Sequence, residues 1–172
     1  MTAFDAGIAA WDWILKYRPM LERPPCGNIY GDGIAWIQTE AVDSQWYRIT
    51  DSDMNDGVLQ RVTHDGSGRL TILRPGIYLA TLDVVWESSR SNEHVEVGLD
   101  LNASGTPAPA SHVHSHTKAA NVEHSTSSTS ILDITAKDTT MDACIRDIDG
   151  NTPNLLVDDL HITVMRIGGN YS

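Results

Sequence analysis

Three histidines at alternate positions are the residues with the clearest capacity for chemistry. They are His112, His114 and His116, each separated from the next by one residue. Side chains alternate along a β-strand, so the three imidazoles would share one face and could converge on a transition metal. Three copies of such a strand around a threefold axis would multiply the ligands. The alternative is a polar strand face that binds nothing.

Two acidic stretches offer oxygen ligands of the kind that calcium prefers. They are Asp51 to Gly57 and Asp147 to Asn151. Neither has the ligand spacing of a helix-loop-helix calcium site. Asp, Asn and Gly are also the residues from which turns are built, so both stretches are predicted to be turns, with calcium binding left open.

No enzyme motif accompanies these residues. Cupin enzymes combine a His-x-His pair with a Glu a few residues later and with flanking glycines and a proline, but here Glu123 is too distant. There is no Gly-x-Ser-x-Gly elbow, and Gly66-Ser67-Gly68 lacks the lysine and length of a phosphate-binding loop. We therefore predict no catalytic residue and no cofactor, with a metal-dependent cupin-like enzyme as the remotest alternative.

Composition excludes several partner classes. The chain has 172 residues and a net charge of −11, with only 12 Lys and Arg, which argues against nucleic acid and anionic membranes as partners. No apolar run has the roughly 20 residues of a membrane span, and the N-terminus does not read as a secretory signal. The expected product is soluble and made in the cytoplasm, with Cys26 and Cys144 as reduced thiols.

The N-terminal region is predicted to be a helical arm. Phe4, Ile8, Trp11 and Leu15 have helix-face spacing between Thr2, a candidate N-cap, and Pro19. A single amphipathic helix must cover its own domain or a partner, and these four residues are the predicted anchors. Residues 23–27 (RPPCG) read as an extended linker, so we place the arm and linker at 1–27 and a second domain at 28–172.

The second domain reads as a succession of short strands. Its pivot is Arg69 to Trp86, two strand-like runs around the turn Arg74-Pro75-Gly76. His94 to Asn102 alternates strictly and is predicted to be half-buried, and the last strand is predicted at Asp159 to Ile167. Eight to ten such strands indicate an all-β antiparallel jelly-roll sandwich. The residues predicted to pack its core or a trimer contact are Tyr78, Leu82, Trp86, Leu160 and Ile162.

The order of these segments resembles the jelly roll of the complement-globular-head and tumour-necrosis-factor families. The similarity lies in "GRLTILRPGIYLATLDVVW", in "STSILDITAKDTTMDACI" and in the C-terminal "LHITVMRIG", and it covers about Val58 to Gly169. The resemblance implies a homotrimer packed through an inner sheet. The last strand departs from the family pattern, since Val157-Asp158-Asp159-Leu160 replaces a segment that is usually rich in aromatic residues.

An acidic trimeric jelly roll behind a helical arm is similar to the decoration or cement proteins of tailed bacteriophages. This resemblance implies a non-enzymatic virion protein on the capsid surface, with the major capsid protein as its partner. A receptor- or carbohydrate-binding head of a fibre or spike is the alternative, with loops such as Ala103 to Ala110 as the binding surface.

Overall fold

The structure is a computed structural model that describes residues 23–39 and 41–169. The predicted arm residues Phe4, Ile8, Trp11 and Leu15 lie outside this range. The elements are β1 (Cys26–Gln38), β2 (Tyr47–Arg48), β3 (Asn55–Gln60), β4 (Val62–His64), β5 (Arg69–Ile72), β6 (Gly76–Ser88), β7 (His94–Leu101), η1 (Pro109–Ser111), β8 (Val113–His116), β9 (His124–Ile134), β10 (Thr139–Asp147) and β11 (Leu155–Gly168). The described residues contain no helix with the length and apolar character needed to cross a membrane.

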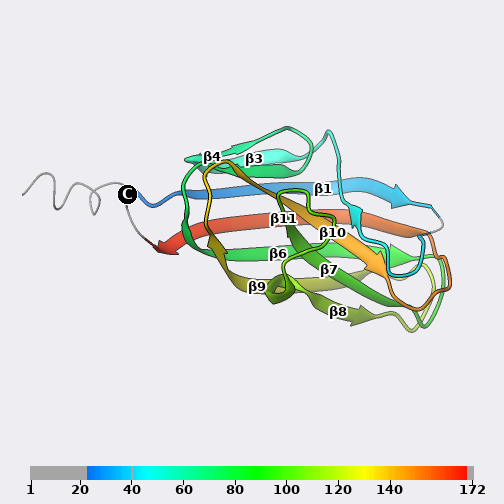
Figure 1. Cartoon of the computed structure of the whole chain (residues 1–172). Coiled ribbons are helices and arrows are strands. Elements are labelled where there is room, and N and C mark those ends of the chain that lie inside the picture. Colours follow the sequence, from blue (N-terminus) through cyan, green and yellow to red (C-terminus); the bar gives the residue numbers. More distant parts are fainter. Residues whose placement is uncertain (1–22, 40, 170–172) are drawn as a thin grey trace, which may run out of the picture.

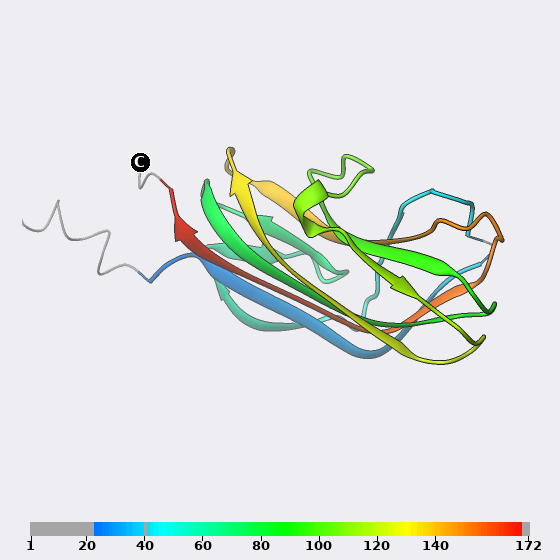
Figure 2. The same ribbon diagram turned by 90° about the horizontal axis from the view of Figure 1, so that it is seen from below.

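Two antiparallel sheets face each other across one core (Figures 1 and 2). Sheet A has the strand order β3-β1-β11-β6-β9, and sheet B has the order β4-β5-β10-β7-β8, with β2 added beside β10. Consecutive strands often lie in different sheets, which is the connectivity of a jelly roll. The predicted all-β antiparallel jelly-roll sandwich is therefore confirmed for the described residues.

Strand β6 is the central element that the sequence predicts. Gly76 opens it at a φ of 150°, where a Cβ would lie only 2.8 Å from the carbonyl oxygen of Gly168, so glycine is required at this turn. The strand pairs along its length with β11 on one side and β9 on the other. Its residues Tyr78, Leu82 and Trp86 are completely buried between the sheets.

The boundaries of three strands differ from the predictions. Strand β1 begins at Cys26, inside the predicted linker. Glycine at position 27 lets the side chain of Val62 pack close to the β1 backbone, since a Cβ there would lie only 2.8 Å from Cγ1 of Val62. Strand β3 begins inside the predicted polar loop. Strand β11 begins at Leu155 rather than Asp159, because an irregularity between Val157 and Asp159 interrupts the alternation without ending the pairing with β6.

Strand β7 is buried on both faces, so the prediction that it is half-buried was wrong. Glu96 and Asp100, on the face predicted to be polar and exposed, are only 3% and 4% exposed. Arg146 and His114 pair with Glu96, while the backbone N–H groups of Ser104 and Gly105 donate to Asp100. A charged residue can occupy a buried position when its partners come from other strands and loops.

The two cysteines are unpaired thiols, as predicted. Cys144 is buried on β10, and burial, followed by the nearby charges of Asp100 and Asp142, raises the pKa of its thiol to about 12. It is therefore protonated at neutral pH.

The hairpin between β4 and β5 depends on Asp65. Its Oδ1 accepts hydrogen bonds from the N–H groups of Ser67 (2.7 Å) and Arg69 (3.1 Å), and Arg48 lies 3.2 Å from Oδ2. Burial alone would raise the pKa of Asp65, but these donors lower it to about 2. A lowered pKa stabilises the fold above the ordinary pKa of the carboxyl, near 3.8, and this contribution is lost as the pH falls through about 2.

We expect Asp65→Ala to destabilise the protein by about 1–2 kcal/mol at pH 7, since two N–H groups lose their acceptor. Urea unfolding at pH 7 and pH 2 measures the effect. The difference between variant and wild type should shrink at pH 2. Asp51→Ala is the control, because Asp51 accepts one turn N–H, from Asp53, and no ion pair joins it to an arginine among the described residues. Equal losses at both pH values would contradict the assigned role of the Asp65 charge.

Candidate functional site

The three predicted metal-binding histidines have three different sets of neighbours. His112 precedes β8, its Nε2 lies 2.9 Å from the carbonyl oxygen of Pro107, and its ring lies 5.1 Å from that of Trp46. His114 Nε2 lies 2.8 Å from a carboxylate oxygen of Glu96. The three rings are thus not directed at one point within the chain.

His116 completes this pattern at the end of β8. Its ring lies 4.3 Å from the ring of His94, and Nδ1 of His94 lies 2.8 Å from Asp149. Among the described residues, one group of three potential ligand atoms lies within 4.8 Å of one another, and it contains no histidine: Glu87, Glu123 and Asp158. The histidine strand is explained within one chain by separate polar contacts.

The predicted packing residues lie in the core of a single chain. Tyr78, Leu82, Trp86, Leu160 and Ile162 are all fully buried between the sheets. The two that have a polar side-chain group both use it in a hydrogen bond. The Tyr78 hydroxyl donates to the carbonyl of Arg74 at 2.8 Å, and Trp86 Nε1 donates to Thr126 at 2.9 Å. Since these side chains have no exposed surface, contacts between subunits must come from other residues.

An exposed apolar surface lies on the outer face of sheet A. It consists of Ile77, Leu79, Ile131, Met165 and Ile167, and we call it the apolar patch. Leu79 is the register partner of both Met165 and Ile131, so these three residues form a row across β11, β6 and β9. Ile131 is 62% exposed and Met165 is 43% exposed. Contiguous exposed apolar side chains of this kind mark an interaction surface.

The composition of this face changes along the strands. The next row consists of Thr163, Thr81 and Thr129, which are register partners across the same strands. Beyond it His161 pairs with Asp83 in register. The apolar patch is therefore confined to the end of sheet A where β1 begins and β11 ends (Figures 1 and 2).

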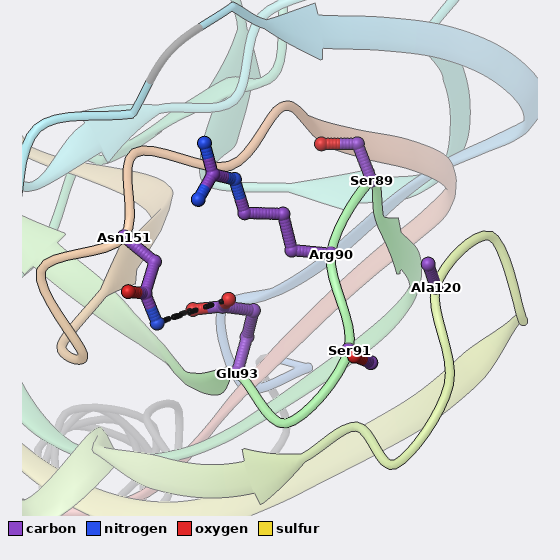
Figure 3. A pocket seen from close by; sticks show the side chains of 6 residues that line it. All are labelled: Ser89, Arg90, Ser91, Glu93, Ala120 and Asn151. Carbon is purple, nitrogen blue, oxygen red and sulfur yellow. Dashed lines mark hydrogen bonds between the residues drawn. The ribbon is translucent and has the colours of Figure 1, made fainter.

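A polar pocket lies at the opposite end of the sandwich, where three loops meet. We call it the loop pocket; its volume is ≈ 460 Å³. Its lining residues come from the β6–β7, β8–β9 and β10–β11 connections (Figure 3): Ser89, Arg90, Ser91, Glu93, Ala120 and Asn151. The amide nitrogen of Asn151 lies 3.2 and 3.3 Å from the two carboxylate oxygens of Glu93.

Glu93, which lines this pocket, lies next to the buried carboxylate of Asp147, the last residue of β10. Glu93 is 1% exposed and Asp147 is 0% exposed, and their carboxylates are within hydrogen-bonding reach of each other. Neither oxygen of Asp147 has a hydrogen-bond donor in good geometry among the described residues, although the backbone N–H groups of Asp149 and Gly150 lie nearby. Burial raises the pKa of both carboxyls.

The two acidic stretches identified in the sequence have different structural roles. In the first, Asp51 accepts the N–H of Asp53 at 2.7 Å, as expected of a turn, whereas Asp56 lies on β3, 2.6 Å from Nδ1 of His64. The second contains Asp147, whose buried partner Glu93 sequence reasoning did not identify. One signal was present: a Glu inside a Ser/Asn-rich turn directly before a strongly apolar strand.

The strand order and the two packed sheets define the class of fold as a TNF-like jelly roll. No protein-family model matches the sequence, and no curated protein matches it either. Among solved structures, the chain is similar to the Eiger TNF from S. frugiperda, with a TM-score of 0.60 and 12% identity over 87% of this chain and 97% of that one. It is also similar to murine APRIL at pH 5.0, with a TM-score of 0.51 and 7% identity over 83% and 99% of the two chains. At such identities the likeness concerns the fold.

Proposed function

We propose that the protein is a non-enzymatic virion structural protein, a homotrimeric decoration or cement protein that binds and stabilises the capsid shell of a tailed bacteriophage. Its partners are two further copies of itself and the major capsid protein. It is made in the host cytoplasm and acts on the capsid surface.

The trimer is supported by the fold together with the apolar patch. TNF-like domains usually form homotrimers, and the row of Leu79, Ile131 and Met165, of which the outer two side chains are exposed, lies on the outer face of one sheet, where a neighbouring subunit can cover it. A shallow hollow beside the patch, lined by Cys26, Val58 and Met165 among others, can receive apolar side chains from that neighbour. Covering a large apolar side chain contributes about 1.5–3 kcal/mol.

One observation carries the capsid role: the chain enters β1 at the same end of the sandwich as the apolar patch. Cys26, the first residue of β1, is the register partner of Met165. Three subunits joined near this patch would bring three arms to one end of the trimer. Weak contacts repeated three times on a rigid body gain affinity by effective concentration, which suits a threefold position on a capsid.

The opposite end suits exposure to solvent. The carboxylates of Glu87, Glu123 and Asp158 gather there, and the loop pocket is polar. An acidic outer surface on a chain of net charge −11 keeps decorated particles from associating.

Deleting residues 2–20 should abolish binding to capsids prepared without this protein, because the proposed anchors Phe4, Ile8, Trp11 and Leu15 are lost. We expect affinity to fall by about 100-fold or more, since three contacts disappear at once. Co-pelleting with capsids measures binding, and sedimentation checks that the shortened chain is still a trimer.

Two point variants refine the test. Ile8→Asp, on the predicted apolar stripe, should reproduce the loss, whereas Asp5→Asn, off the stripe, should bind normally. Unchanged capsid binding by the shortened trimer would refute the proposed role of the arm.

A further inference from the structure

We propose that Glu93, Asp147 and Asn151 form a binding site for a divalent cation, Ca²⁺ in the first place, at the base of the loop pocket. The site goes beyond the proposed capsid role and depends on different residues. Calcium takes carboxylate, amide and backbone carbonyl oxygens, and it tolerates irregular geometry.

The first observation is the buried carboxylate of Asp147. It is 0% exposed, and neither oxygen has a hydrogen-bond partner within the part of the chain that the structure describes. A buried charge without a partner is costly, and proteins normally supply a donor, a counter-charge or a metal. The adjacent carboxyl of Glu93 is also buried, and two acidic groups held side by side in this way favour protonation unless a cation lies between them.

The second observation is the convergence of further oxygen donors from two loops. Glu93 lies at the end of the β6–β7 connection, whereas Asn151 lies in the β10–β11 connection, and the two side chains point toward each other across the pocket (Figure 3). Rotation of the Asn151 amide by 180° presents Oδ1 in place of the nitrogen. The open side of the pocket leaves room for water molecules to complete the coordination shell.

The surrounding charges leave the two carboxylates unneutralised. The carboxylate of Asp149 contacts both the backbone N–H and Nδ1 of His94. The ring of His116 packs against that of His94. Arg90 is the nearest cation in the pocket, and its side chain extends across the pocket toward the β10–β11 loop (Figure 3). No ion pair joins Arg90 to Glu93 or Asp147 among the described residues.

The neighbouring group of Glu87, Glu123 and Asp158 is the competing location, and it provides the matched control. Its three ligand atoms lie within 4.8 Å of one another, but Glu123 is exposed and the other two are only half-buried. Solvent screens such charges, and exposed acidic groups commonly exist without a metal.

The test uses the full-length chain treated with a chelator and then dialysed. Calorimetric titration with CaCl₂ at pH 7.5 should give one site per chain with a Kd on the order of 10⁻⁴ M. At about 10 mM Ca²⁺ the unfolding midpoint should rise by about 5 °C or more relative to NaCl of equal ionic strength.

The variants locate the site. Asp147→Asn and Glu93→Gln should each weaken binding by about tenfold or more and cut the thermal shift at 10 mM Ca²⁺ to about half or less. Glu123→Gln should leave both unchanged, and Arg90→Gln should tighten binding about two- to threefold by removing a repelling charge. Circular dichroism verifies folding, and because Asn and Gln match the shape of the acids, each variant tests the ligand role independently.

Three results would overturn the proposal. The first is the absence of heat and of a thermal shift at 10 mM Ca²⁺, Mg²⁺ or Mn²⁺. The second is binding that survives both Asp147→Asn and Glu93→Gln. The third is binding that is lost in Glu123→Gln alone, which would assign the cation to the exposed carboxylate group.

Discussion

A variant with aspartate at both Ile131 and Met165 is expected to sediment as a folded monomer, whereas the wild-type chain is expected to sediment as a trimer. The two residues flank Leu79 in the apolar row and have most of its exposed surface. Each covered side chain contributes about 1.5–3 kcal/mol, and both are replaced in all three subunits. Enclosing unpaired carboxylates at the same contact costs several kcal/mol more, so the association should fail completely.

The control introduces the same charges elsewhere. Val42 and Val122 are 53% and 46% exposed and lie in loops away from the patch, so Val42→Asp with Val122→Asp should remain trimeric. Sedimentation velocity gives the oligomeric state, and circular dichroism shows whether the sheets are intact. A trimer that persists in Ile131→Asp/Met165→Asp, or a wild-type monomer, would remove the basis of the proposed assembly.

Alternation predicted the strands well because one face of most of them meets a core made by the same chain. In β6 and β11 the residues predicted to be internal, such as Tyr78, Leu82 and Ile162, are buried. The same rule failed on β7, where Glu96 and Asp100 are also buried. Hydropathy assigns charged residues to solvent. It cannot detect a buried ion-pair partner such as Arg146, which is 50 positions from Glu96 in the sequence.

The outer face of sheet A and the loop pocket were harder to predict for a different reason. Met165 and Ile131 read as ordinary strand residues, and only the pairing of β11 and β9 with β6 makes them one surface. Glu93 and Asp147 likewise meet because the β6–β7 connection lies against the end of β10. The local sequence pattern shows which residues share a face of one strand. The apolar patch and the Glu93–Asp147 pair depend instead on which strands and loops become neighbours in the fold. The histidine hypothesis shows the converse, since regular spacing alone does not bring His112, His114 and His116 to one point.

Asp142→Ala is expected to cause the largest loss of stability of any single substitution considered. Asp142 lies on β10, is 1% exposed, and accepts hydrogen bonds from Nε and Nη2 of Arg69 at 2.9 and 2.8 Å. Nε of Arg48 lies 2.7 Å from the same carboxylate. The hydrogen bond to Asp142 raises the pKa of the Arg69 guanidinium, which therefore stays charged.

Truncation would leave two partly buried cations without their shared anion, and breaking a buried pair in this way costs about 3–5 kcal/mol. For a chain of this length the unfolding midpoint should fall by roughly 10 °C. Asp138→Asn is the control, because Asp138 is exposed and lies 3.9 Å from Lys137, an arrangement that contributes about 0–1 kcal/mol, and asparagine tolerates its φ of 59°. A loss below about 1 kcal/mol for Asp142→Ala would mean that solvent compensates the arginines, and that backbone pairing and apolar packing suffice to hold β10 between β5 and β7.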